Sequence, residues 1–213
     1  MHLPKPGEGG NFTQVPGGNF PAICYRVVDL GTQESTFQGE VSKKHQVMIS
    51  WELKDDECVM SGGQYDGQPM TMHKSYTWSM HEKATLRKHL EAWRGKPFKD
   101  TDFGPDGFDI RNLLGVPCML MIVQNENGGK TYSNISGIAK LPKNLPVAEL
   151  FNQRVYFSLD DFNAEVFESL SERLQERIKL SPEYQQMGSG KPAMQGGRAP
   201  VDDEIPFAPE WRG

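Results

Sequence analysis

The stretch PMTMHKSYTWSMHEKATLRKHLEAWRGKP, residues 69–97, joins a predicted strand to a predicted helix and decides the fold. Residues 69–78 are rich in threonine and aromatic residues and contain no glycine, which is typical of a strand. Ser79 followed three residues later by Glu82 forms a capping box, so the helix is expected to begin there. One strand therefore leads directly into one capped helix.

The helix has one apolar face and a defined end. Leu86, Leu90 and Trp93 recur at helical spacing, which indicates a stripe that faces a core. Gly95 can adopt the left-handed conformation that ends many helices, and Pro97 cannot extend one.

Two strands are predicted before this unit and two after it, at residues 22–30, 45–53, 116–124 and 130–139. A hairpin turn at 125–129 joins the last two. Three strands, one helix and two strands follow one another in the order of an OB-fold, a five-stranded Greek-key barrel. Another small barrel or an α+β sheet would also fit five strands at this spacing. We expect a mainly β protein with added helices, built on a five-stranded OB-fold barrel.

The chain divides into four parts by composition. Residues 1–21 are rich in glycine and proline and are expected to be a flexible N-terminal arm. Residues 22–146 form the barrel domain, and residues 147–185 a C-terminal helical extension. Residues 186–213 read as a disordered linker and acidic tail.

A C-terminal helix is predicted over residues 162–179, with Ser158 as the N-cap of its first turn. Its apolar stripe consists of Phe162, Val166, Leu170, Leu174 and Ile178. The stripe either packs onto the barrel or forms a subunit contact, which would make the protein a homo-oligomer through this helix.

The bulk composition excludes several classes of protein. The net charge of −5 arises entirely in residues 146–213, which carry 7 basic and 12 acidic residues. Three widely spaced cysteines indicate a reducing cytoplasm. No apolar stretch approaches the roughly 20 residues that cross a bilayer, so no membrane contact is expected. The N-terminus lacks the apolar segment of a signal peptide.

Catalysis has little support in the sequence. The five histidines show no metal-ligand spacing, and His81 and His89 are too far apart on one helix to share a metal. Nucleophile-elbow, phosphate-loop and dinucleotide-binding motifs are absent from the sequence. We expect a protein that is not an enzyme and that needs no cofactor or metal.

Residues 202–207, Asp-Asp-Glu-Ile-Pro-Phe, follow the linker and resemble the acidic tip of bacterial single-stranded DNA-binding proteins. In that family such a tail docks into pockets on replication and repair enzymes. The resemblance implies a partner-binding role for Asp202, Asp203, Glu204, Ile205, Pro206 and Phe207. Ile205 and Phe207 would be apolar anchors, and the acids would steer toward a basic rim. Family tails usually stop at the phenylalanine, whereas residues 208–213 follow here, so the terminal carboxylate contact is lost.

Residues 15–145 are similar to phage-encoded single-stranded DNA-binding proteins. The similarity rests on residues 76–98 and 112–132. It implies an OB-fold nucleic-acid-binding domain that coats single strands during phage replication or recombination, in the cytoplasm of a bacterial host cell. The tail would recruit replication or recombination proteins.

Binding of single strands without sequence preference requires aromatic faces for the bases and cations for the backbone. Tyr76 and Trp78 share a strand face with Lys74, and a lysine inside a core would be costly, so this face is expected to bind DNA. Tyr132 lies among polar residues and is expected to be exposed, whereas Trp51 belongs to the core. The expected cations are Arg26, Lys43, Lys44, Lys74, Lys130 and Lys140.

Two other functions remain open. A protein-interaction or assembly factor would use the barrel and the C-terminal helix for protein contacts. A small hydrolase or nuclease would cleave nucleic acid with a divalent metal.

Overall fold

A computed structural model describes residues 14–37, 40–103, 107–146 and 149–188. Six strands dominate it, which confirms a mainly β protein with added helices. The strands are β1 Gly18–Phe37, β2 Glu40–Leu53, β3 Thr71–Thr77, β4 Pro117–Asn127, β5 Lys130–Ala139 and β6 Val155–Phe157. The proposed tail, residues 202–207, lies outside the described residues.

Five strands form an antiparallel path in the order β3-β2-β1-β4-β5, and β6 pairs parallel with β1. β3 and β5 are the two edges of this path, and no ladder of hydrogen bonds joins them. The expected five-stranded barrel therefore needs correction in two respects. The sheet has six strands, and it is open rather than closed.

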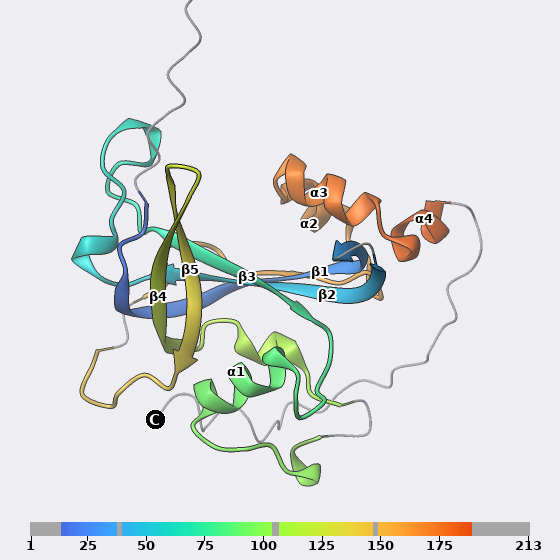
Figure 1. Ribbon diagram of the computed structural model, residues 1–213, viewed down its shortest axis with the longest axis horizontal. Coiled ribbons are helices and arrows are strands. Elements are labelled where there is room, and N and C mark those ends of the chain that lie inside the picture. Colours follow the sequence, from blue (N-terminus) through green and yellow to red (C-terminus); the bar gives the residue numbers. More distant parts are fainter. Residues whose placement is uncertain (1–13, 38–39, 104–106, 147–148, 189–213) are drawn as a thin grey trace, which may run out of the picture.

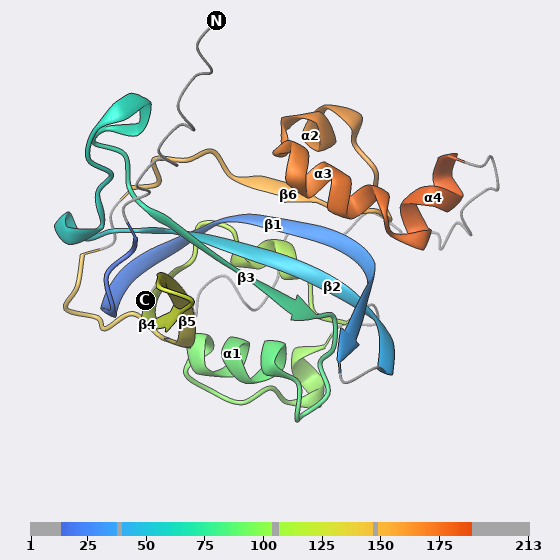
Figure 2. The same ribbon diagram turned by 45° about the horizontal axis from the view of Figure 1, so that its top comes forward.

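The helices lie on both sides of the sheet (Figures 1 and 2). The α-helices are α1 Thr85–Arg94, α2 Ala164–Ser169, α3 Glu172–Lys179 and α4 Pro182–Gly188. Single 3-10 turns occur at Asp56–Cys58, Gly63–Tyr65, Asp100–Asp102 and Ile110–Leu113. In Figure 1, α1 lies on one side of β1 and β2, and α2 to α4 lie on the other. No helix in the described ranges is long and apolar enough to cross a membrane.

Helix α1 confirms the predicted end but not the predicted start. Gly95 has φ 77° and ψ 16°, and its N–H bonds the carbonyl of Glu91. The helix begins at Thr85 rather than near Ser79, because the Ser79 hydroxyl accepts a hydrogen bond from the His81 N–H and closes a tight turn instead. The predicted capping box is therefore wrong.

The inner core lies between the sheet and α1. Trp51 is fully buried, as predicted, and its ring lies 5.8 Å from that of Trp93 on α1. Leu86 and Leu90 complete the buried stripe of the helix. The apolar alternation of the sequence accounts for this core.

The outer face of the sheet is also covered, as one of the two interpretations of the C-terminal stripe predicts. Val28 and Met48 pack there against Phe157 of β6 and against Leu170 and Ile178 of the C-terminal helices. These contacts favour the interpretation that the C-terminal stripe packs onto the chain's own sheet. Its buried members are thereby unavailable for a subunit contact.

Glu52 anchors the segment that leads into β6. Its side chain is fully buried, although the alternation of β2 predicts a polar surface position. The backbone N–H groups of Phe151 and Asn152 donate to the carboxylate at 2.8 Å, and Lys54 forms an ion pair with it. Burial alone would raise the pKa of Glu52, but these hydrogen bonds lower it below its ordinary value. A buried charge satisfied in this way is tolerated.

The predicted single helix over 162–179 is wrong. The chain bends at Leu170 and Ser171, both of which are extended, so that α2 and α3 are separate helices. Asn163, not Ser158, is the N-cap residue of α2, and its side chain accepts from the Val166 N–H. The bend allows residues on both helices to reach one apolar surface.

Strands β1 and β2 extend beyond their predicted bounds. Residues 18–21, predicted to lie in the arm, are the first residues of β1 and pair with β4. Residues 31–37 and 40–44, predicted as a polar connection, form a long hairpin. The outer part of this hairpin is largely exposed and needs no apolar residues, so the period-2 pattern that identifies a strand is missing there.

His45 connects α4 to the β1–β2 hairpin. Its Nε2 lies 2.7 Å from Asp29, and its Nδ1 lies 3.6 Å from Glu183 of α4. Glu183 also accepts hydrogen bonds from the N–H and hydroxyl of Thr32. The Asp29 hydrogen bond and the nearby carboxylates of Asp29, Glu183 and Asp160 raise the pKa of His45.

We expect His45→Gln to destabilise the protein more at about pH 5 than at about pH 8. Because the folded-state pKa of His45 is raised, its contribution is complete below its unfolded pKa and is lost as pH rises through the folded value. The contribution should be at most about 1 kcal/mol, since the pair is partly exposed. Urea unfolding of both proteins across this pH range measures it. A difference in stability that grows with pH would contradict the assignment.

Candidate nucleic-acid interface

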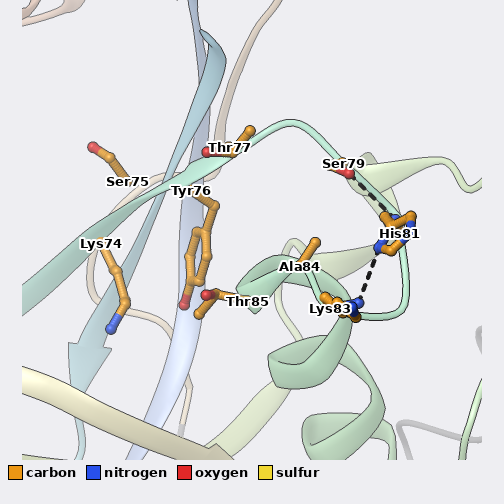
Figure 3. Close-up of a pocket in the computed structure, with 9 residues that line it drawn as sticks. All are labelled: Lys74, Ser75, Tyr76, Thr77, Ser79, His81, Lys83, Ala84 and Thr85. Atoms are coloured by element: carbon orange, nitrogen blue, oxygen red, sulfur yellow. Dashed lines mark hydrogen bonds between the residues drawn. The ribbon is translucent and has the colours of Figure 1, made fainter. Parts of the chain in front are cut away.

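A groove of about 620 Å³ opens at the free edge of the sheet, between β3 and the start of α1 (Figure 3). The lining residues are Lys74, Ser75, Tyr76, Thr77, Ser79, His81, Lys83, Ala84 and Thr85. Two lysines and several hydroxyl groups thus border one open cavity. Such a lining suits an anionic, polar polymer rather than an apolar ligand.

Lys74 lies at the gap between the two sheet edges. Its ammonium group donates a hydrogen bond of 2.7 Å to the backbone carbonyl of Ile135 on β5. Partial burial lowers the pKa of Lys74. The side chain is therefore neither in the apolar core nor at an ordinary surface position, and it borders the groove as a partly desolvated cation.

Tyr76 is not available for stacking, which corrects the predicted binding face. It points from β3 toward α1 and is only 4% exposed (Figure 3). Its hydroxyl lies 3.0 Å from Nδ1 of His89 on α1. Burial and the charge of Lys74 lower the pKa of His89 to about 4, so the neutral imidazole accepts this hydrogen bond. The pair is a structural polar contact of the inner core.

Trp78 follows β3 directly and is 48% exposed, as the sequence predicts for a binding residue. The Trp78 backbone N–H donates to the His45 carbonyl at 2.8 Å, which holds Trp78 next to His45 on β2. Its ring lies 6.1 Å from the His45 ring. The indole is therefore held beside His45 with about half of its surface open to a base.

Tyr132 lies on the β4–β5 hairpin and is 49% exposed, again as predicted. Strand pairing places Tyr132 opposite Asn125, and Val123 opposite Asn134, so these side chains share one face. Val123 is 42% exposed on that face. The other face is covered by the chain at Val15, whose carbonyl accepts hydrogen bonds from Gln124 and Ser133. One hairpin face therefore remains open, with an aromatic ring on it.

The two exposed rings are separate contact points. Four successive antiparallel pairings make β3 and β5 run in the same direction. Lys74 of β3 and Ile135 of β5 are in contact. Trp78 follows Lys74 toward the C-terminal end of β3, whereas Tyr132 precedes Ile135 toward the N-terminal end of β5. At a rise of about 3.3 Å per residue, the rings are on the order of 20 Å apart along the strands.

The structure does not gather the predicted cations into one patch. Lys43 and Lys44 lie on the long hairpin, where Lys43 forms an ion pair of 2.5 Å with Glu34. Lys130 is exposed at the β4–β5 turn, and Lys140 lies against Gly95 at the far end of α1. Arg26 lies on β1 and donates to Ser50 on β2. Among the predicted cations, only Lys74 lines the groove.

Other functional candidates were not identified from the sequence. His81 and Lys83 line the groove, because the turn after Trp78 brings them back beside β3. Arg173 and Arg177 of α3 lie near His73, as Arg26 does, and their spacing of four residues on one helix is the signal that could have indicated them. In the part of the chain that the structure describes, no three His, Cys, Asp or Glu side chains are arranged to hold a metal.

Comparisons with known proteins give no further assignment. A scan against models of known protein families finds none that matches the chain, and a search of curated proteins finds no match.

Proposed function

We propose that this protein binds single-stranded DNA without catalysis and largely without sequence preference. It coats and protects single strands in phage replication or recombination, in the cytoplasm of a bacterial host cell. Through residues 202–207 it recruits replication or recombination proteins. The resemblance of residues 15–145 and 202–207 to single-stranded DNA-binding proteins supports these roles.

The observation that carries the proposal is the pair of half-exposed rings, Trp78 and Tyr132, beside an open sheet edge with a lysine-lined groove. A stacked base contributes about 1–3 kcal/mol, and it does so for any base because every base has an aromatic face. Lys74 and Lys83 supply positive charge for the backbone between such stacking points.

The strand order supports assignment to the OB-fold class. An OB-fold is a five-stranded, partly open barrel. The path β3-β2-β1-β4-β5, with α1 between β3 and β4 in the chain, has the matching number and order of elements. The open β3–β5 side, spanned by Lys74, agrees with a barrel of this kind that is only partly closed.

Intrinsic fluorescence provides the test. Among the tryptophans of the described residues, Trp51 and Trp93 are buried and Trp78 is half-exposed, so oligo-dT should quench the Trp78 emission by stacking. Trp211 lies outside the described residues, and its emission is present in the wild type and in the Trp78→Phe variant alike. Single-stranded oligonucleotides of different sequence should bind with similar affinity, and duplex much more weakly. The Trp78→Phe variant is the matched control, because it keeps an aromatic ring and should lose the quenching.

Duplex bound as strongly as single strand would contradict the proposal. Unchanged emission and no binding of oligo-dT would instead favour the assembly factor, in which the sheet and the C-terminal helices contact protein.

A further inference from the structure

Three arginines lie near one exposed histidine on the outer face of the sheet. Arg26 of β1, Ser50 of β2 and His73 of β3 are direct partners across the strands. Partial desolvation lowers the pKa of His73, and Arg26, Arg173 and Arg177 are all close enough to lower it further. This arginine cluster joins the sheet to α3.

The arginine cluster is not neutralised within the described residues. Arg26 donates to the Ser50 hydroxyl at 3.3 Å, and Arg177 donates to Ser75 and Gln46 at 3.3 and 2.6 Å. In the described ranges none of the three guanidinium groups forms an ion pair with a carboxylate. Glu52, which follows Ser50 on the same face of β2, is already paired with Lys54.

The two guanidinium groups on α3 repel each other. Arg173 and Arg177 are four residues apart on α3, where like charges destabilise a helix. Burial and the charge of Arg173 both lower the pKa of Arg177. An anion held by several guanidinium groups would remove this repulsion, and their planar forks match phosphate oxygens well.

Strand β3 connects the arginine cluster with the groove. Successive side chains of a strand point to opposite faces, so Lys74 and Tyr76 face inward while His73 and Ser75 face outward. Ser75 both lines the groove and accepts the hydrogen bond from Arg177. A polymer that follows the free edge of β3 can therefore reach both surfaces.

We propose that Arg26, Arg173 and Arg177 bind backbone phosphates of the single strand as it passes from the groove over the free edge of β3. The inference rests on the proposed function and extends it, because it gives the C-terminal helices a direct part in DNA binding. A continuous polyanion fits better than an isolated small anion, since the arginines come from two elements and each can contact a different phosphate.

The test compares Arg173→Ala with Lys179→Ala in the full chain. Both variants remove one positive charge from α3, but Lys179 lies over the Phe167 ring, away from the cluster. Binding of labelled oligo-dT is measured by fluorescence anisotropy over a series of NaCl concentrations. For one lost phosphate contact, the slope of log affinity against log salt should fall by about 0.7 in Arg173→Ala and remain unchanged in Lys179→Ala.

Two further measurements separate binding from a structural effect. Arg173→Lys should restore the slope but not the full affinity, because lysine keeps the charge without the planar fork. Nuclear magnetic resonance of the wild type should show that saturating oligo-dT raises the pKa of His73, since bound phosphate opposes the guanidinium charges. Urea unfolding of each variant checks that the fold is retained.

The outcomes are distinguishable. If the wild type binds oligo-dT but Arg173→Ala and Lys179→Ala have equal slopes, the arginine cluster is not a phosphate site and the proposed function stands. Bound oligo-dT that leaves the His73 pKa unchanged would likewise overturn the phosphate site alone. If the wild type does not bind oligo-dT at all, both proposals are overturned.

Discussion

Replacing Trp78 by alanine is expected to weaken oligo-dT binding by about 5- to 150-fold, the equivalent of about 1–3 kcal/mol for one lost stacking contact. The ring is 48% exposed and held beside His45, so little ordering is required before a base stacks on it. Tyr132→Ala should have an effect in the same range. Because the two rings are far apart, their effects should add as free energies in the double variant.

The matched control for these variants is Tyr76→Phe. Tyr76 is an aromatic residue of β3 that is only 4% exposed, so loss of its hydroxyl should leave the affinity for oligo-dT unchanged. Fluorescence anisotropy at a fixed salt concentration measures the affinities of the wild type and of the four variants. The salt slope should not change in Trp78→Ala, since stacking involves no phosphate. Equal affinity of Trp78→Ala and wild type would remove the main support for the interface.

Phe157→Ala is expected to destabilise the protein by about 3–5 kcal/mol, the cost of a large cavity in a packed core. Phe157 is 1% exposed, and its ring lies 5.6 Å from Phe167 and 5.7 Å from Phe162. Because β6 pairs with the central strand β1, the loss should lower the stability of the whole domain. Urea unfolding monitored by circular dichroism and by tryptophan fluorescence measures it.

Phe162→Ala is the comparison for Phe157→Ala. Phe162 belongs to the same ring cluster but is 39% exposed, so its removal should cost only about 1 kcal/mol. If Phe157→Ala lowers the free energy of unfolding by no more than the small amount expected for Phe162→Ala, the outer core contributes little to stability. Unfolding of the C-terminal helices in a separate transition would show that they are not part of one cooperative unit.

The inner half of the fold could be predicted from the sequence because its strands and helix each have one buried face. β3, α1 and the glycine end of α1 follow from local pattern and backbone preference. The β4–β5 turn was also predictable, since Gly128 and Gly129 both adopt positive φ there. The start of α1 was not, because Ser79 can cap a helix or a turn and only the tertiary contacts select between them.

The outer half could not be predicted because its signals are short or non-local. β6 has three residues and forms only where β1 offers a free edge. Glu52 reads as a surface residue until the backbone of residues 151 and 152 satisfies its carboxylate. The C-terminal stripe reads as one continuous helix, since the extended backbone at Leu170 has no mark in the sequence.

The exposure of the candidate interface residues was predicted in part. Alternation placed Lys74, Tyr76 and Trp78 on one face, and the cost of burying lysine suggested that this face was exposed. The structure satisfies the Lys74 ammonium with a carbonyl at the sheet edge, so Tyr76 can be buried beside it. Trp78 remains exposed because β3 ends at Thr77. Trp78 and Tyr132 thus have the predicted exposure, whereas the cations are scattered.

The hydrogen bond from Lys74 to Ile135 has a consequence for self-association. An unpaired sheet edge is a template on which a second polypeptide can add a strand and begin a fibre. A polypeptide annealing along β3 would have to enter the gap that the Lys74 side chain spans and would break its hydrogen bond to Ile135. The same ammonium group attracts oxyanions, so Lys74 would disfavour strand addition at the edge where we propose that DNA binds.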